Sequence, residues 1–136
     1  MPDTTHVLVI GAGAAGSAAI RELAQHEGIT TTAIIDTETT PHNRTLINKA
    51  VATGLLDASQ AHLPAPPVPS IRDSVHAVDP VEQTVHLRSG ARLNYEALIA
   101  ATGITPRFLP PATASPAALD SERVTPLHGE RNTTQT

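Results

Sequence analysis

The sequence predicts an α/β fold, a parallel sheet with one helical layer and a small antiparallel β-meander on its other side. An apolar run over residues 7–10 leads through a glycine-rich turn into an alanine-rich stretch, and a β-branched run follows over residues 30–35. A second apolar run, over residues 97–101, ends in Thr102 and Gly103. A strand, a helix and a strand within about 30 residues are typical of a βαβ unit, whose strands are parallel.

The first half of the chain predicts these elements in order. Residues 7–10 are continuously apolar, as expected of a strand buried on both faces. Residues 14–26 predict a helix that Gly28 ends, and residues 30–35 predict a second strand that Asp36 ends. Residues 44–53 predict a short helix before Gly54, and residues 57–62 predict a further helical turn.

The second half is expected to be mostly β. The prolines within residues 64–69 predict an extended linker. Polar and apolar residues alternate over residues 74–79 and 84–87, which predicts a hairpin, and residues 97–101 predict another buried parallel strand. Beyond Gly103, prolines at positions 106, 110, 111, 116 and 126 interrupt every pattern, so residues 104–136 are expected to form mostly an irregular arm.

Composition restricts the class of protein. The 136 residues suffice for one domain, and the net charge of −4 with only two aromatic residues argues against a nucleic-acid partner. Without cysteine, the chain has no disulfide, thiolate metal site or dithiol redox centre, and its seven histidines have no metal-binding spacing, so we expect no metal. No basic leader and no apolar run long enough for a membrane span are present, so the expected location is the cytoplasm, with no membrane partner.

The glycine-rich turn is the candidate ligand-binding site. Gly11, Gly13 and Gly16 form a G-x-G-x-x-G pattern between a predicted strand and a predicted helix, which is typical of a Rossmann-like dinucleotide site. Gly11 permits the tight turn, Gly13 lets the backbone approach a pyrophosphate, and Gly16 lets the helix pack closely on the strand. The amides of Ala14 and Ala15 would face the phosphates at the positive end of the helix dipole.

The second strand ends in a candidate ribose ligand. Asp36 lies 20 residues after Gly16, where a carboxylate binds the adenosine ribose hydroxyls and repels a 2′-phosphate, so NADP is disfavoured at this turn. Thr37 is a neighbouring candidate. No Gly-Lys-Ser/Thr follows, which excludes a Walker A loop. The fingerprint alone leaves FAD and NAD open, because both contain ADP.

Three segments resemble the N-terminal part of the FAD domain in the pyridine nucleotide-disulfide oxidoreductase superfamily. The first is GAGAAGSAAIREL with Asp36, where Ile20 replaces a small residue and Asp36 replaces the more usual Glu. The second, PHNRTLINKAVATG, resembles the P-Y-x-R-x-x-L-S-K-x-x-x-x-G region of ferredoxin and rubredoxin reductase-like flavoproteins, with His42 for Tyr and Asn48 for Ser. The third, TVHLRSGARLNYEALIAATGITPRFLP, is similar to their hairpin and A-T-G-x-x-P-R strand end.

The resemblance implies roles for further residues. Lys49 would lie over the isoalloxazine and stabilise negative charge on the reduced flavin, as the one candidate catalytic residue. Arg44 would contact the pyrophosphate or the adenosine side. Val78 would flank the adenine. Ala101, Thr102 and Gly103 would line the cofactor beyond the carboxyl end of their strand.

The resemblance further implies an FAD-dependent NAD(P)H oxidoreductase. Residues 1–110 would be the N-terminal segment of the FAD-binding domain, and residues 111–136 a proline-rich polar arm toward an NAD(P)H domain that this chain lacks. The cofactor would be FAD, NADH or NADPH the co-substrate, and an electron-acceptor protein the partner. The chain is expected to be truncated, and a second chain or an oligomer completing the site stays open. The alternatives are a dinucleotide-binding module without turnover and an NAD-dependent dehydrogenase, for which no catalytic acid or base is recognisable.

Overall fold

The computed structural model describes residues 4–36, 40–105, 107 and 115–119. It divides into two compact units, Met1–Pro41 with Leu63–Gly103 and His42–His62 with Ile104–Thr136. The first unit contains both sheets and the longest helix of the described residues. Each unit is described below by itself.

The first unit is built on a four-stranded parallel sheet. Its strand order is β3 (Ser70–Arg72), β2 (Ile29–Ile35), β1 (Thr5–Ile10) and β7 (Ala97–Ala100). All three neighbouring pairs are parallel, so the carboxyl ends of the strands meet at one edge of the sheet. In this register Ile10 is aligned with Ile34 on one side and Ala100 on the other.

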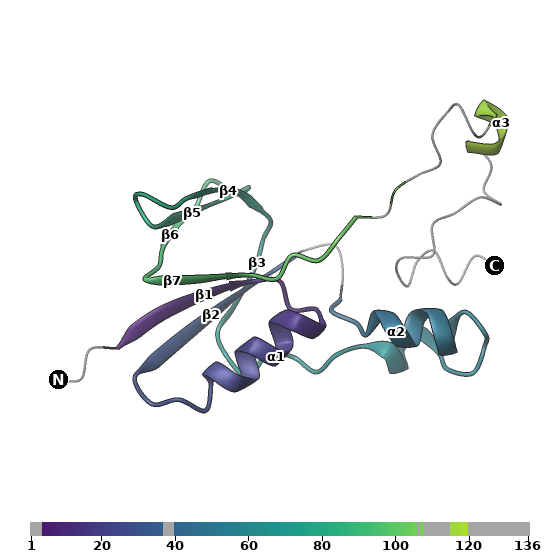
Figure 1. The fold of residues 1–136 in the computed structure, drawn as a ribbon, viewed down its shortest axis with the longest axis horizontal. Coiled ribbons are helices and arrows are strands. Elements are labelled where there is room, and N and C mark those ends of the chain that lie inside the picture. The colour runs from purple at the N-terminus through teal and green to yellow at the C-terminus, as the bar shows by residue number, and fades with distance from the viewer. Residues whose placement is uncertain (1–3, 37–39, 106, 108–114, 120–136) are drawn as a thin grey trace. The chain divides into compact units, whose positions relative to one another are not determined.

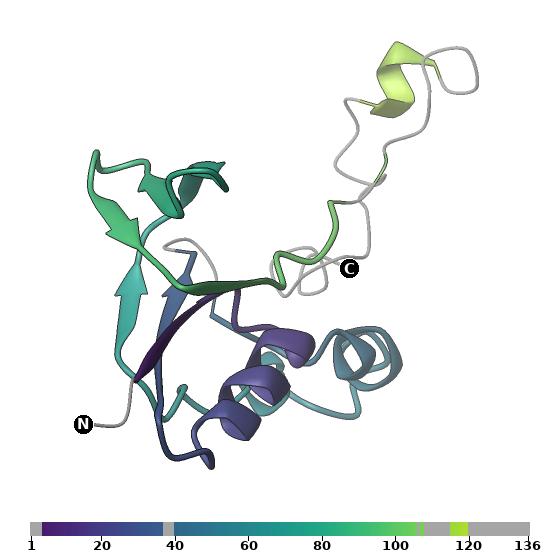
Figure 2. The same ribbon diagram turned by 60° about the vertical axis from the view of Figure 1, so that its left-hand side comes forward.

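The two faces of this sheet bury different side chains, because successive strand residues alternate between the faces. Helix α1 (Ala14–Leu23) covers one face, and an antiparallel sheet covers the other (Figure 1 and Figure 2). Beneath α1 lies a core cluster of Val7, Val9, Ala12, Ile20, Ala33 and Ile35. The opposite cluster contains Leu8, Ile10, Ile34, Val85 and Leu87. The arrangement confirms the predicted fold class of a parallel sheet with one helical layer and an antiparallel meander.

The antiparallel sheet consists of β4 (Val75–Asp79), β5 (Thr84–Leu87) and β6 (Arg92–Asn94), in that order. Asp73 links the start of β4 to the turn between β5 and β6, since its carboxylate accepts hydrogen bonds from the amides of Ser74, at 2.7 Å, and Ser89, at 3.4 Å. The Ser89 side chain, followed by these amides and Arg88, lowers the pKa of Asp73 against a partial desolvation that raises it. The ionised carboxylate therefore stabilises the connection between β3 and the meander.

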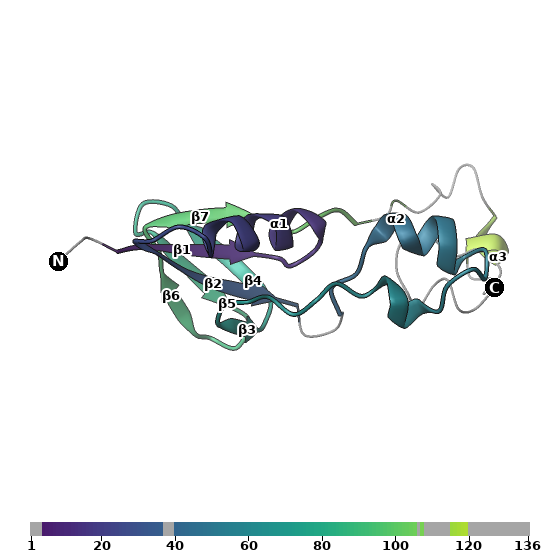
Figure 3. The same ribbon diagram turned by 90° about the horizontal axis from the view of Figure 1, so that it is seen from below.

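Helix α1 is shorter than its sequence pattern predicts. It ends at Leu23 with Ala24 as its C-cap, and the residues up to His26 form turns. Gly28, with a φ of 79°, therefore does not end the helix; its carbonyl accepts a hydrogen bond from the Thr5 amide, at 2.9 Å, at the entry to β2. Seen from the side that α1 covers, the helix runs along the strands (Figure 3).

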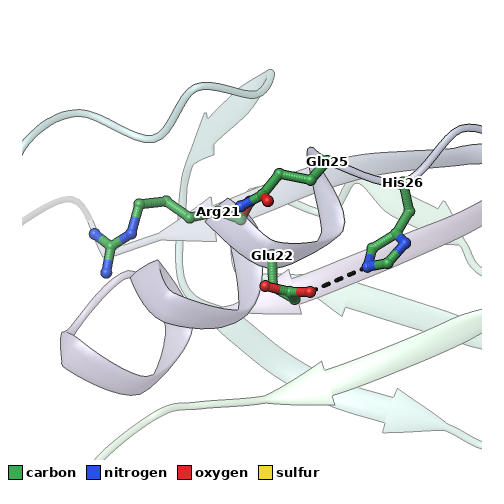
Figure 4. Close-up of polar contacts among 4 residues, drawn as sticks. All are labelled: Arg21, Glu22, Gln25 and His26. Atoms are coloured by element: carbon green, nitrogen blue, oxygen red, sulfur yellow. Dashed lines mark hydrogen bonds and ion pairs between the residues drawn. The ribbon is translucent and has the colours of Figure 1, made fainter.

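The last turns of α1 are held by polar contacts on its exposed side. His26 Nε2 lies 3.1 Å from Glu22 Oε1, and Gln25 Nε2 donates to the Arg21 carbonyl at 3.1 Å (Figure 4). The buried side carries Ile20, which is fully buried under the sheet. Ile20 thus supplies core volume at the position where the resembling family has a small residue.

Two features of the parallel sheet differ from the sequence prediction. Residues 70–72 form strand β3, for which the sequence pattern makes no prediction; Ile71 pairs with Ile34 and packs into the core. Strand β7 was expected to be buried, but it is at the edge of the sheet, and Ala97 and Ala100 are exposed. An apolar run does not reveal whether a strand has one neighbour or two.

The His42–His62 part of the second unit contains three short helical segments, α2 (Arg44–Leu46), η1 (Ile47–Val51) and η2 (Ala58–Ala61). Asn43 begins α2, because its side-chain oxygen accepts from the amides of Thr45 and Leu46. In η1 the Ala52 amide donates to the Ile47 carbonyl at 2.9 Å, five residues back, which makes it a π-helical turn. The helix predicted over residues 44–53 is therefore present but changes its hydrogen-bond spacing at Ile47.

The arm predicted beyond Gly103 lies largely outside the described residues. In its described part, residues 116–119 form α3 (Pro116–Leu119). Pro116 begins this helix rather than interrupting it, as proline is tolerated at a first helical position. In the described part of the chain, no helix has the length and apolar content needed to cross a membrane.

Candidate functional site

The turn after β1 is anchored to both neighbouring strands. Gly11 donates its amide to the Ile34 carbonyl of β2, and Ala101 donates to the Ile10 carbonyl of β1, each at 2.8 Å. Gly11 has a φ of 97°, and a Cβ built there would collide with the carbonyl oxygen of Ala101 and lie 2.9 Å from its carbon. The fold itself therefore requires glycine at position 11.

Gly16 is required by the fold for a different reason. It lies in the first turn of α1, and a Cβ there would collide with the Gly11 carbonyl oxygen and lie 2.8 Å from its carbon. The Ala101 Cβ would be 3.4 Å away. The close approach of α1 to β1 and to the end of β7 thus depends on the missing side chain, as the sequence predicted for the helix and the strand.

Gly13 is different from both. A Cβ built on Gly13 meets no heavy atom within 4 Å, apart from the adjoining backbone. Its φ of −66° and ψ of −167° are open to any L-residue. Neither packing nor backbone conformation requires glycine here. A bound molecule can therefore approach the main chain at the open face of Gly13.

Beside this open face, the first amides of α1 have no acceptor among the residues that the structure describes. The first main-chain bond of α1 runs from the Ser17 amide to the Gly13 carbonyl, at 2.8 Å. Gly13 is the N-cap and provides no side-chain cap, and no acidic residue lies in the first turn. The amides of Ala14, Ala15 and Gly16 have no acceptor among the described residues, so they can bind an anion.

Ser17 holds the turn in shape and was missed by the sequence reasoning. Its buried hydroxyl donates to the Ala12 carbonyl at 2.7 Å, which fixes the residue between the first two glycines. A serine in the first turn of a helix is common, and no sequence pattern sets this one apart. Only the fold reveals its contact with the loop.

Asp36 and Arg72 lie together at the same edge of the sheet. Asp36 follows the last residue of β2 and is exposed. Arg72, the last residue of β3, donates from Nη1 to the Asp36 carbonyl at 3.2 Å. The candidate Thr37 lies outside the described residues. The sequence reasoning found Asp36 but not Arg72, because β3 was not predicted.

The end of β7 meets the glycine turn. The Ala101 carbonyl occupies the space that a side chain at Gly11 would need, and Ala101 is only partly exposed. Thr102 and Gly103 follow Ala101 along the chain and are both exposed, and Gly103 has a φ of 77°. The structure therefore brings the glycine turn and the Ala101–Gly103 segment together, whereas their contact with a cofactor stays a prediction.

Arg44 and Lys49 belong to the second unit. Arg44 is exposed at the start of α2, and Lys49 is exposed on the π-helical segment η1, while the neighbouring Ile47 is fully buried. Lys49 is the only lysine of the chain. These positions leave both cationic groups accessible to a ligand, and their roles stay predictions.

Val78 lies on the antiparallel sheet. It pairs with Val85, is 40% exposed and lines a shallow hollow together with His76, Ala77, Asp79, Pro80 and His86. No three His, Asp or Glu side chains of the described residues are placed to hold a metal ion together. The adenine contact of Val78 and the expectation of no metal both stay predictions.

The residues of the first unit fit the ADP part of a dinucleotide. The open face of Gly13 and the free amides of the first turn of α1 can bind a pyrophosphate. Asp36 directly follows the neighbouring strand β2, at the place where the adenosine ribose attached to that pyrophosphate would lie. A comparison with protein-family models matches residues 5–127 to the family described as pyridine nucleotide-disulphide oxidoreductase.

This chain belongs to the pyridine nucleotide-disulphide oxidoreductase family. Its parallel sheet with one helical layer and an added antiparallel sheet is the fold of the FAD-binding domain in related flavoproteins. The ferredoxin and rubredoxin reductase-like resemblance drawn from the sequence is confirmed. A comparison with curated protein sequences gives no match.

Solved structures of several reductases are similar to this chain. The NADH:rubredoxin oxidoreductase of Clostridium acetobutylicum is 26% identical with a TM-score of 0.71, over 96% of this chain and 34% of that one. The reductase of a covalent putidaredoxin reductase–putidaredoxin complex is 27% identical with a TM-score of 0.69, over 84% and 29%. The ferredoxin reductase for the CYP199A2 system of Rhodopseudomonas palustris is 26% identical with a TM-score of 0.65, over 82% and 30%. The chain thus spans about a third of the length of these relatives.

Proposed function

We propose that this chain binds FAD as part of a flavin-dependent NAD(P)H oxidoreductase. The observation that carries the proposal is the contrast among the three glycines of the turn. Gly11 and Gly16 are required by the fold, whereas Gly13 faces open space in a conformation that any residue can adopt. A ligand that must approach the main chain accounts for glycine at position 13, and a pyrophosphate is such a ligand.

The first unit would bind the ADP half of FAD. The amides of Ala14 and Ala15 donate to the pyrophosphate, and the positive end of the α1 dipole attracts it. Asp36 accepts hydrogen bonds from the adenosine ribose, with Thr37 beside it, and Val78 flanks the adenine. Ala101, Thr102 and Gly103 line the cofactor where β7 ends.

The second unit would contribute two cations. Arg44 contacts the pyrophosphate or the adenosine side, and Lys49 stabilises negative charge on the reduced flavin. When bound, FAD supplies a ring that accepts a hydride from NADH or NADPH and passes electrons to an acceptor protein. The exposed ammonium of Lys49 can take this position without losing a buried contact.

The activity of the whole protein is part of the proposal, because the chain spans about a third of its solved relatives. Residues 1–110 are proposed as the N-terminal segment of the FAD domain, and residues 111–136 as an arm leading toward an NAD(P)H domain. The segments that complete the site would come from the same protein or from a second chain. The cytoplasmic location stays a prediction as well.

Flavin selectivity tests the proposal. FAD and FMN carry the same ring, but only FAD carries the ADP group that the first unit is built to bind. Titration of flavin into the purified chain, followed by quenching of flavin fluorescence, should show saturable binding of FAD that excess ADP reverses. Equal binding of FAD and FMN, or FAD binding that ADP leaves unchanged, would contradict the proposal.

The role of Lys49 can be tested separately, because this residue is the only lysine. An amine-reactive reagent can modify only Lys49 and the N-terminal amine, and mass spectrometry distinguishes the two. We expect FAD to slow modification of Lys49, whereas ADP should not, because ADP lacks the flavin ring. Equal protection by both ligands would remove Lys49 from the flavin site.

A dinucleotide-binding module without turnover is the second candidate. It would bind FAD or ADP in the same way but leave NADH unchanged. Mixing the chain with FAD and NADH and following absorbance at about 340 nm tests this second candidate, since NADH oxidation faster than with free FAD would exclude it. A rate no greater than that of free FAD would mean that this chain alone does not hold a nicotinamide in reach of the flavin, since hydride transfer needs the reacting atoms within about 3–3.5 Å.

A further inference from the structure

A buried hydroxyl bonds to the loop beside the proposed pyrophosphate site. The Ser17 side chain is buried, and its hydroxyl donates to the Ala12 carbonyl at 2.7 Å. A serine within a helix commonly bonds back to the carbonyl four residues earlier, which here belongs to Gly13. That carbonyl accepts the Ser17 amide at 2.8 Å, whereas the hydroxyl reaches one residue further, to a carbonyl outside the helix. The Ser17 hydroxyl therefore acts on the loop rather than on the helix.

The bond to Ala12 also sets the direction of the next amide. The Ala12 carbonyl and the Gly13 amide belong to one planar trans peptide group, so the C=O and N–H bonds point in opposite directions. Since the carbonyl is turned toward the buried Ser17, the Gly13 N–H is turned away from it. Gly13 is partly exposed, and its amide has no acceptor among the residues that the structure describes. Ser17 thus fixes the direction of an amide donor on the residue whose Cβ position faces open space.

The main chain of the described residues does not supply this anchor. The amides of Gly11 and Ala101 fix the part of the turn before Ala12, and the Ser17 amide fixes the Gly13 carbonyl after it. No main-chain amide of the described residues donates to the Ala12 carbonyl. The peptide group between Ala12 and Gly13 is therefore held by a side chain.

We propose that Ser17 is a positioning residue of the pyrophosphate site, which holds the Gly13 amide as a third donor beside the amides of Ala14 and Ala15. The proposal rests on the proposed function, and it extends the set of phosphate donors by one residue before α1. A donor that is oriented before the ligand arrives avoids the cost of ordering on binding, which raises affinity. Without the hydroxyl, the peptide group between Ala12 and Gly13 gains freedom to rotate, and the amide loses its fixed direction.

The test follows ADP binding and the Gly13 amide together on the full chain. In NMR spectra of isotope-labelled protein, the Gly13 amide signal is assigned by its disappearance in Gly13→Ala. ADP should move this amide proton downfield in wild type, as expected of a hydrogen bond to a charged acceptor. In Ser17→Ala the displacement at saturating ADP should be lost. The dissociation constant from a calorimetric titration should rise about tenfold, the effect of losing one charge-assisted hydrogen bond.

A matched control separates positioning from stability. Leu87→Val alters a buried side chain in the core cluster on the opposite face of the sheet, so it disturbs the packing of the same unit without touching the turn. Its ADP dissociation constant and its Gly13 displacement should equal those of wild type. An unchanged displacement and affinity in Ser17→Ala, or an equal loss in Leu87→Val, would overturn the inference.

The experiment also distinguishes this inference from the proposed function. If ADP fails to bind wild type, the proposed nucleotide site is wrong. If ADP binds wild type but leaves the Gly13 amide signal in place, only the inference is wrong.

Discussion

Replacing Gly16 with alanine should destabilise the first unit. The added Cβ would lie 2.8 Å from the Gly11 carbonyl carbon, where carbon atoms are most favourably about 3.5 Å apart. The carbonyl oxygen is closer still, so the helix or the turn must move against main-chain atoms that two strands hold in place. Overpacking of this kind costs about 3 kcal/mol at the upper end of its usual range. Alanine recovers about 1 kcal/mol of helix propensity, so the expected net loss is about 2 kcal/mol.

Urea unfolding followed by circular dichroism measures this loss, and thermal unfolding should show a fall of about 8–16 °C in Tm for a domain of this size. Gly13→Ala is the matched control on the same turn. Its Cβ faces open space at an allowed backbone conformation, so its stability should equal that of wild type or exceed it by up to about 1 kcal/mol. If Gly16→Ala were as stable as Gly13→Ala, the close packing of α1 on β1 and β7 could not be the reason for glycine at position 16.

Three further variants test other contacts. Asp36→Ala should weaken ADP binding by about 1.5–3 kcal/mol in a calorimetric titration, and equal affinity would remove Asp36 from the ribose site. Ser17→Ala should lower the free energy of unfolding by about 1–2 kcal/mol, because it leaves the buried Ala12 carbonyl without its donor; an unchanged urea midpoint would contradict that role. Hydrogen bonds from Ser89 lower the pKa of Asp73, so its stabilisation is present above about pH 4 and is lost as pH falls further. Asp73→Asn should therefore reduce the fall in Tm between pH 6 and pH 3, and an unchanged slope would show that this carboxylate is not involved.

The strands that could be predicted are those with strong local patterns. Residues 7–10 and 30–35 are apolar or β-branched runs beside a glycine turn, and the hairpin alternates with period two; all appear as expected. Strand β3 has only three residues and follows a proline-rich stretch. It becomes a strand because Ile71 can pair with Ile34 and fill the core, a tertiary effect that no local pattern contains.

The site residues likewise divide into those that a local sequence pattern reveals and those that only the fold reveals. The spacing of Gly11, Gly13, Gly16 and Asp36 was recognisable because main-chain geometry and phosphate approach require it. Ser17 and Arg72 were not recognisable, because each acts through a carbonyl oxygen and any polar residue in the sequence could do so. The sequence also could not separate the glycines that the fold requires from the one that it does not, since that distinction depends on which atoms surround each Cβ.

The most direct measurement of the central claim is a calorimetric titration of ADP into wild type and Gly13→Val. The account predicts that Gly13→Val folds with the circular dichroism spectrum and urea midpoint of wild type, because the side chain enters open space. It also predicts that ADP binding is lost, because the side chain occupies the position that the pyrophosphate needs. A folded Gly13→Val protein that binds ADP as tightly as wild type would contradict the account, and would show that this glycine turn serves the fold alone.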